Sequence, residues 1–286
     1  MIIWIASYPK SGNTWIRSIL SAYLFSEDGK FSFKLLKNID RFSSKNLLSA
    51  SVKDSNHQSR VSKYWIPSQK TINQDKKIHF LKTHNALCTI DNNKFTDQFN
   101  TIAAIYIVRD PRNLITSLAH HYELSLEEAF NFLSNKRKII FPQNFVKEDK
   151  STNKPEDFNF LADWSDHYIS WKNISFCPIK IIKYEDLMID AESIFVSTLE
   201  FLSKFLKIKL DKKKINNALI STSFNKLSLM EKKEGFQEAI ISSKTKKKIR
   251  FFNLGEKNDW NKLLDKKIIR KIESNFKNEM IELLYL

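Results

Sequence analysis

The stretch Ile2–Trp15, "IIWIASYPKSGNTW", decides the fold that we expect for this chain of 286 residues. Its first five residues are apolar and rich in β-branched or aromatic side chains, which is typical of a buried strand. A polar turn begins at Ser7, and a helical pattern with one apolar stripe follows over Thr14–Phe25. A strand, a tight turn and a helix in this order place unpaired helical N–H groups at the end of the strand. The stretch therefore predicts an anion-binding turn at the edge of a sheet.

Three further apolar runs have the length and composition of buried strands. They are Ile78–Leu81, Ile102–Val108 and Ile179–Ile182. Because these runs are continuously apolar rather than alternating, they favour a parallel sheet that is covered on both faces. Besides Thr14–Phe25, helical patterns follow two of the strands, at Pro111–Tyr122 and Ala191–Leu206. This alternation indicates an open α/β sheet, in which ligands bind beyond the carboxyl ends of the strands.

Residues 123–178 interrupt the alternation with two helical segments, "LSLEEAFNFLSNK" and "FLADWSDHYISWK". No Gly- or Ser-rich linker separates them from the rest, so we interpret them as a helical insertion or lid within a single domain that spans 1–286. The apolar spacing of Lys262–Leu286 predicts a final packing helix. Aromatic residues of the insertion are expected to build a core. The histidines on predicted helices are interpreted as surface or pocket-lining residues: His120, His121 and His167.

The composition excludes several classes of protein. Hydrophobic residues make up 42% of the chain, and aromatic residues make up 13%, which is enough for a core and argues against global disorder. Two cysteines, Cys88 and Cys177, cannot form a disulfide scaffold, and no Cys/His cluster has the spacing of a zinc site. There is no apolar window long enough for a membrane span and no basic leader, so we expect a cytoplasmic protein.

The net charge of +15 points to anionic ligands or to a solvated basic surface. The cationic residues are 8 arginines and 39 lysines, whereas surfaces dedicated to nucleic acid rely more on arginine. We therefore expect no nucleic-acid partner. A non-catalytic polyanion-binding or nucleic-acid-binding protein stays open as an alternative, and it would gather its lysines in one patch.

The turn after the first strand has the composition of a phosphate cradle. Lys10 supplies a point charge, Gly12 allows close approach of the backbone, and Ser11, Asn13 and Thr14 supply hydrogen-bond donors. The turn is not a Walker loop, which needs a second glycine and a lysine placed directly before Ser/Thr in the helix. A nucleotide-dependent kinase that uses this loop with magnesium remains a further alternative.

The two other strand ends also carry polar residues. Arg109 stands at the end of the third strand, and Ser117 lies eight residues later in a helix that Asp110 is expected to cap. A guanidinium and a hydroxyl in this arrangement suit a second phosphate. In "KTH", Lys82 and His84 lie on one face of an extended segment, and we expect His84 to open into the same crevice as Lys10.

Together, "SYPKSGNTW", "KTH" and "VRDPRNLITS" resemble the sulfotransferase family that uses 3′-phosphoadenosine 5′-phosphosulfate (PAPS). "KYEDL" at Lys183–Leu187 and "TSFNKL" at Thr222–Leu227 fit the family in order, and "NLGEKNDW" at Asn253–Trp260 fits in part. The motifs span nearly the whole chain. The resemblance implies a P-loop-NTPase-like sulfotransferase architecture, with a central parallel sheet flanked by helices.

The resemblance also implies roles for individual residues. Those expected to bind the 5′-phosphosulfate side of the donor are Lys10, Ser11, Gly12, Asn13, Thr14 and Trp15. Those expected to hold the 3′-phosphate or frame the adenosine are Arg109, Ser117, Tyr184, Thr222 and Phe224. His84 would be the general base, Lys82 would stabilise the sulfuryl group in transit, and Lys10 would stabilise the leaving phosphate. A sulfuryl group carries less charge than a phosphoryl group, so no metal is expected.

One segment departs from the family pattern. Asn253 and Leu254 stand where the family commonly has Arg and Lys to grip the 3′-phosphate, and only Gly255 of that triplet remains. Whether Arg250 compensates is left open. The sequence thus predicts an enzyme that moves a sulfuryl group to a hydroxyl or amine of a small-molecule acceptor. It names neither the acceptor nor the oligomeric state.

Overall fold

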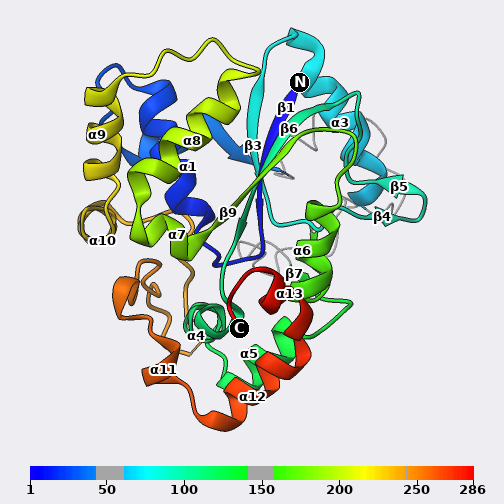
Figure 1. The fold of residues 1–286 in the computed structure, drawn as a ribbon, viewed down its shortest axis with the longest axis vertical. Coiled ribbons are helices and arrows are strands. Elements are labelled where there is room, and N and C mark those ends of the chain that lie inside the picture. Colours follow the sequence, from blue (N-terminus) through cyan, green and yellow to red (C-terminus); the bar gives the residue numbers. More distant parts are fainter. Residues whose placement is uncertain (43–60, 141–157, 243) are drawn as a thin grey trace. The chain divides into compact units, whose positions relative to one another are not determined.

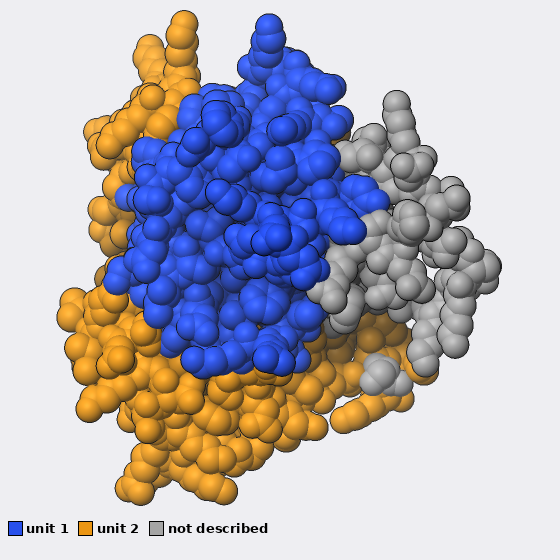
Figure 2. All heavy atoms as spheres, turned by 90° about the vertical axis from the view of Figure 1, so that its right-hand side faces the viewer, with its two compact units in different colours: residues 1–8, 39–107, 136–182 blue, residues 9–38, 108–135, 183–286 orange. Residues whose placement is uncertain are grey.

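The computed structural model describes residues 1–42, 61–140, 158–242 and 244–286 (Figure 1). The chain divides into two compact units (Figure 2). The first unit comprises Met1–Tyr8, Ile39–Ile107 and Lys136–Ile182. The second unit comprises Pro9–Asn38, Val108–Asn135 and Lys183–Leu286. The main sheet belongs to the first unit, and most of the helices belong to the second.

The main sheet has five strands in the order β2-β3-β1-β6-β9. Their bounds are β1 (Ile2–Ser7), β2 (Ile39–Arg41), β3 (His79–Thr83), β6 (Thr101–Val108) and β9 (Ile179–Lys183). β1 pairs in parallel with β3 and β6, and β3 pairs in parallel with β2. The four predicted strands and the parallel sheet are confirmed. The fifth strand, β2, was not predicted because three residues with one buried side chain give no periodicity to detect.

The register of the central strands aligns their carboxyl ends. Ala6 of β1 lies opposite Thr83 of β3 and Tyr106 of β6, and Ser7 lies opposite Ile107. His84 therefore leaves the sheet beside Ser7. Every residue of β1 is buried, as expected for a central strand.

Strand β9 differs from the prediction in its burial. It lies at the edge of the sheet, and Ile182 is its only buried residue. The expectation that this apolar run is a fully buried strand is wrong, because an edge strand has a neighbour on one side only.

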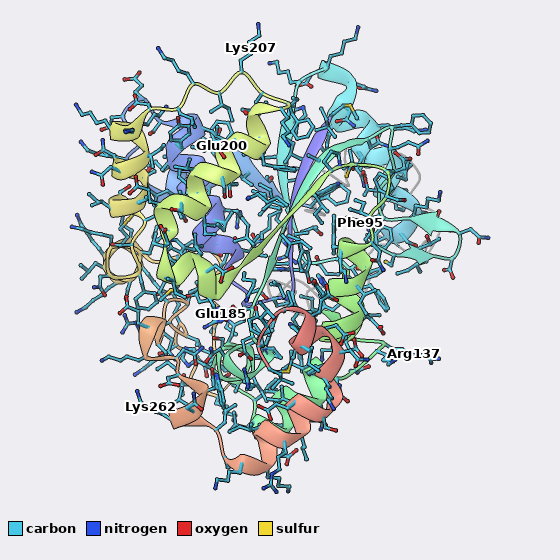
Figure 3. The ribbon with its side chains drawn as sticks, viewed as in Figure 1. Phe95, Arg137, Glu185, Glu200, Lys207 and Lys262 are labelled. Carbon is cyan, nitrogen blue, oxygen red and sulfur yellow. The ribbon has the colours of Figure 1, made fainter. Side chains whose placement is uncertain are left out.

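Short hairpins and two α-helices complete the first unit. Their bounds are β4 (Thr89–Ile90), β5 (Asn93–Lys94), β7 (Ile139–Ile140), β8 (Asn159–Phe160), α3 (Trp65–Ile72) and α6 (Trp164–Lys172), with the short 3₁₀ helices η2 (Val61–Tyr64) and η3 (Asn73–Asp75). Phe95, labelled in Figure 3, is fully buried among aromatic rings from β1, α3 and α6. Its ring centre lies 5.1 Å from that of Trp4, 5.3 Å from Trp65 and 6.1 Å from Trp171. The aromatic core predicted for "FLADWSDHYISWK" is thus confirmed.

The second unit is built from helices. Their bounds are α1 (Asn13–Phe25), η1 (Phe33–Asn38), α4 (Pro111–Tyr122), α5 (Leu126–Leu133), α7 (Tyr184–Ile189), α8 (Ala191–Ser203), α9 (Lys212–Ser221), α10 (Phe224–Glu234), η4 (Gly255–Lys257), α11 (Trp260–Leu263), α12 (Lys266–Asn275) and α13 (Lys277–Glu282). Helix α1 packs against η1 and α9, and α4 packs against α5 and α12. Asp110 caps α4 as predicted, because its side chain accepts a hydrogen bond from the Arg112 amide.

One expectation about the helices needs correction. The tail predicted as one helix over Lys262–Leu286 contains the end of α11 and the helices α12 and α13. Asp265 caps the start of α12, and Phe276 lies between α12 and α13. The segment 123–178 divides between the units, with α5 in the second and α6 in the first, while residues 141–157 lie outside the described part. Within the described residues, no helix is long and apolar enough to span a membrane.

Candidate functional site

The turn between β1 and α1 has the backbone of an anion-binding loop. Lys10 and Gly12 both have positive φ angles, 68° and 101°, and α1 begins at Asn13, one residue before the prediction. Gly12 is the N-cap residue, and no side chain caps the helix. The positive end of the helix dipole at this turn favours an anionic ligand, although the Trp15 amide already donates to the Gly12 carbonyl.

The Tyr184 ring packs tightly against this turn. A Cβ atom on Gly12 would overlap Cδ2 of Tyr184, so only glycine fits here. The guanidinium carbon of Arg109 lies 4.2 Å from the centre of the same ring, and the Trp15 ring meets it edge-on at 5.9 Å. Four of the predicted donor-binding residues thus form one cluster, although they come from three separate segments of the chain.

Arg109 links the turn to helix α4. Its Nη1 donates to the Lys10 carbonyl at 3.1 Å and to Oγ of Ser117 at 3.3 Å. Arg109 and Ser117, which are predicted to hold one phosphate, thus lie in contact. Nδ2 of Asn258 also donates to the Ser117 hydroxyl at 3.2 Å, and Asn258 is a contact that the sequence did not single out.

The remaining predicted residues of the adenosine side lie around α10. Gly255 has a φ of 57° and faces the Phe224 ring, which a Cβ atom would meet at 2.6 Å. Thr222 is fully buried, and its hydroxyl donates to the Ala218 carbonyl of its own chain segment. Arg250 donates to the Ser228 hydroxyl at 2.7 Å. Phe224 and Gly255 thus lie in contact, whereas Thr222 bonds within its own segment.

The Lys10 ammonium and the Thr14 hydroxyl of the cradle contact residues that follow α10. The Lys10 ammonium lies 3.6 Å from the centre of the Phe251 ring. The Thr14 hydroxyl donates to Glu238 at 3.3 Å, and Arg17, which is 2% exposed, forms an ion pair with Glu238 at 2.6 Å. Glu238 thus places a carboxylate against a hydroxyl that is predicted to bind the donor.

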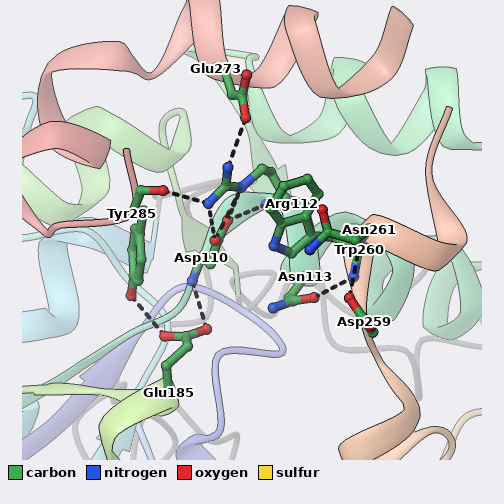
Figure 4. A network of polar contacts seen from close by, with 9 residues as sticks. All are labelled: Asp110, Arg112, Asn113, Glu185, Asp259, Trp260, Asn261, Glu273 and Tyr285. Carbon is green, nitrogen blue, oxygen red and sulfur yellow. Dashed lines mark hydrogen bonds and ion pairs between the residues drawn. The ribbon is translucent and has the colours of Figure 1, made fainter. Parts of the chain in front are cut away.

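A buried ion network holds the start of α4 (Figure 4). Arg112 pairs with Asp110 and with Glu273, each at 2.7 Å, and it also donates to the Tyr285 carbonyl at 2.6 Å. The Trp260 ring lies below the Arg112 guanidinium, at 4.0 Å. Charge-assisted bonds of this kind are stronger than neutral ones. The network therefore fixes the position of Asp110, which directly follows Arg109 in the sequence.

The network continues to the residue after Tyr184. Glu185 accepts the Asp110 amide at 3.1 Å and the Tyr285 hydroxyl at 2.9 Å. Burial raises the pKa of the Glu185 carboxyl and that of the Tyr285 hydroxyl above their usual values. These contacts join the segments that carry Arg109 and Tyr184. Sequence reasoning missed Glu185 and Tyr285 because 100 residues separate them.

Lys82 and His84 belong to the first unit, and the other predicted residues from Lys10 onward belong to the second. Lys82 is buried in β3, and His84 is the first residue after this strand. Nδ1 of His84 lies 2.7 Å from the Ser7 carbonyl oxygen. A carbonyl only accepts hydrogen bonds, so Nδ1 carries the proton and Nε2 carries the lone pair in the neutral ring.

The other predicted histidines fall into different environments. His120 bonds the Arg250 carbonyl through Nε2 and is not buried, which fits the expected helix surface. His167 is fully buried, so the interpretation of it as a helix-surface residue is wrong. Its two ring nitrogens bond Tyr106 and the His84 carbonyl.

Several polar atoms of the cradle fit a phosphate-bearing nucleotide. Oγ of Ser11, Nε1 of Trp15 and Nε of Arg109 are buried and have no hydrogen-bond partner among the residues that the structure describes. An unsatisfied buried donor costs about 1–3 kcal/mol, so a ligand that pairs with it is favoured. In the same part of the chain, no group of three or more His, Cys, Asp or Glu side chains has the arrangement of a metal site.

Comparison with known proteins agrees with this geometry. A family model described as a sulfotransferase domain matches residues 2–283 and so spans both units. Luciferin sulfotransferase of Photinus pyralis is 25% identical over 305 aligned residues, which cover 99% of this chain and 75% of that protein.

Solved structures give the same fold. Mouse sulfotransferase SULT7A1 complexed with PAP aligns with a TM-score of 0.56 and 19% identity, covering 97% of this chain and 84% of that one. Retinol dehydratase in complex with androsterone and the inactive cofactor PAP aligns with a TM-score of 0.60 and 14% identity, covering 98% and 80%. The chain therefore belongs to the sulfotransferase family, the enzymes that use PAPS as sulfuryl donor.

Proposed function

We propose that this protein transfers the sulfuryl group of PAPS to a hydroxyl or amine of a small molecule, with His84 as the general base and Lys10 stabilising the leaving phosphate. The observation that carries the proposal is the position of Arg109, which bonds both the Lys10 carbonyl and the Ser117 hydroxyl. One guanidinium thus ties the predicted 5′ side of the donor site to its 3′ side.

The donor would be held by charge and by backbone amides. The turn around Gly12 and the first turn of α1 suit the 5′ end, where negative charge develops on the oxygen that leaves with the nucleotide. Lys10 adds a cation at this end. Arg109 and Ser117 suit the 3′-phosphate, and the Asn258 amide beside Ser117 supplies a donor near the place where Asn253 and Leu254 replace the basic pair of the family.

The orientation of His84 supports its role as base. With Nδ1–H held by the Ser7 carbonyl, Nε2 accepts the proton of the acceptor hydroxyl while the acceptor oxygen bonds to sulfur and the bond from sulfur to the phosphate oxygen breaks. Ser7 precedes Lys10 by three residues, and the Cα atoms of residues so spaced lie within about 11 Å of each other.

The acceptor is proposed to be a small apolar alcohol. Retinol dehydratase has been solved with retinol and with androsterone, which are both alcohols. The experiment is transfer of the labelled sulfuryl group from PAPS to a panel of alcohols, phenols and amines, with ATP and magnesium as the comparison donor. Saturable labelling of an alcohol supports the proposal. Phosphorylation from ATP without any sulfuryl transfer would contradict it and favour the kinase alternative.

A further inference from the structure

The segment that begins at His84 is fastened by helix α6. After β3 ends at Thr83, residues 84–88 form no helix or strand, and the Ala86 amide donates to the Phe160 carbonyl of β8 at 2.8 Å. Three side chains of α6 also contact this segment. Nε2 of His167 bonds the His84 carbonyl at 3.1 Å, Nε1 of Trp171 donates to the Asn85 carbonyl at 2.8 Å, and Oγ of Ser170 accepts the Leu87 amide at 3.0 Å.

The spacing of these residues explains their common direction. His167, Ser170 and Trp171 are three and four positions apart, so they lie on one face of the helix. Both His167 and Trp171 are fully buried. This face of α6 thus supplies three hydrogen bonds to the irregular segment after β3.

His167 is held in a single protonation state by its partners. Its Nε2 must carry a proton to bond the His84 carbonyl, so Nδ1 accepts from the Tyr106 hydroxyl, which lies at 2.8 Å. The Tyr8 amide in turn contacts the Tyr106 hydroxyl. Burial lowers the pKa of His167 to about 4, so the ring is neutral near neutral pH.

We propose that His167 is a positioning residue for His84, and that Tyr106 fixes the direction in which His167 donates. This inference rests on the proposed role of His84 as the base. The His84 ring is held by Ser7 through Nδ1, and its backbone is held by His167 through the carbonyl oxygen. Two anchors on the same residue restrict the direction of Nε2, which is the atom that must meet the acceptor proton.

The test compares His167→Leu with His167→Gln. The leucine variant loses the donor to His84, whereas glutamine can accept from Tyr106 and donate to the carbonyl. We expect His167→Leu to lower kcat by about 10- to 100-fold, since small displacements of a reacting group have effects of this size. We expect unchanged KM for PAPS and unchanged Kd for PAP, and substantial recovery of kcat in His167→Gln.

The matched control is Ser170→Ala, which removes a different bond between α6 and the same segment and should leave kcat close to that of the wild type. Nitrogen-15 NMR of labelled histidines gives a readout independent of activity. The His84 signals, identified by their loss in His84→Ala, should report protonated Nδ1 in the wild type and a tautomer mixture in His167→Leu. If His167→Leu fails to fold, Tyr106→Phe replaces it, with the same shift of the His84 signals and a fall in kcat expected.

The outcomes separate the two levels of the account. Full activity of His84→Ala would overturn the role of His84 and this inference with it. An inactive His84→Ala, together with wild-type kcat and an unchanged His84 spectrum in His167→Leu or its replacement, would overturn the positioning role alone. Equal losses of kcat in His167→Leu and Ser170→Ala would show that α6 acts only as general support, and would also overturn it.

Discussion

Nη1 of Arg109 lies 3.3 Å from Oγ of Ser117, and the same nitrogen donates to the Lys10 carbonyl. Replacing Arg109 by lysine keeps the charge but loses the planar fork that can bond a phosphate twice. Hydrogen bonds to charged groups are worth about 1.5–3 kcal/mol, so we expect Arg109→Lys to weaken PAP binding by about 10- to 100-fold.

Titration calorimetry with PAP and with ADP distinguishes the 3′-phosphate from the rest of the nucleotide. We expect the loss to be confined to PAP, with the exposed Arg137→Lys as a control that leaves both nucleotides unaffected. Equal weakening of PAP and ADP by Arg109→Lys would argue against a 3′-phosphate role for Arg109.

Gly12→Ala tests the contact between the turn and Tyr184. Gly12 has a φ of 101°, and an added Cβ atom would overlap the Tyr184 ring. Gly235 also has a positive φ, 75°, but its nearest neighbour is the flexible Lys248 ammonium at 3.4 Å. Gly235→Ala therefore reports a backbone cost without a ring clash, and this control is stringent because its ψ of 172° lies in a region that only glycine adopts readily. We expect Gly12→Ala to lower the melting temperature clearly more than Gly235→Ala and to weaken PAP binding. Equal melting temperatures would show that the Tyr184 ring yields freely.

Glu238→Gln tests whether the Glu238 carboxylate competes with the donor. The carboxylate accepts from Thr14 and pairs with the buried Arg17. Removing its charge removes a repulsion toward phosphate and leaves the Arg17 cation uncompensated, and both effects favour an anionic ligand. We expect PAP to bind several-fold more tightly, with a lower melting temperature of the free protein. Weaker PAP binding in Glu238→Gln would mean that Glu238 supports the cradle rather than opposing the ligand.

The pH dependence of stability should report His167. Its pKa falls from 6.5 to about 4 on folding because burial penalises the charged ring. The unfolded chain then binds a proton that the folded chain does not, so stability is fully present above about pH 6.5 and falls as the pH drops toward 4. The full effect is about 3 kcal/mol. Urea unfolding at pH 7 and pH 5 should show a smaller loss of stability in His167→Gln than in the wild type. An equal loss in both proteins would exclude His167 as the source.

The buried strands and the motifs that follow them could largely be predicted from the sequence. Ile2–Ala6 and Ile102–Val108 are apolar throughout, and burial on both faces leaves few alternatives to such runs. The local motifs around Gly12 and Arg109 also predicted their neighbours, since the turn, the N-cap Asp110 and Ser117 are all close in sequence.

The long-range contacts that hold these motifs in place could not be predicted from the sequence. Glu185 meets Tyr285, and Thr14 meets Glu238, across 100 and 224 residues, and neither pair has a local pattern. His167 looked like a surface histidine because its helix mixes polar and aromatic residues, and only the fold shows that its polar atoms are paired inside the core. Similarly, β2 and the break between α12 and α13 depend on tertiary packing rather than on periodicity.

The most direct measurement of the central claim is sulfuryl transfer by His84→Ala, alongside PAP affinity of the same variant. His79→Ala, at the start of the strand that ends just before His84, is the control; among the ion pairs of the described residues, His79 pairs only with the nearby Asp75. The account predicts that His84→Ala binds PAP as tightly as the wild type but transfers no detectable label from PAPS, while His79→Ala remains active. Transfer by His84→Ala at the wild-type rate would contradict it.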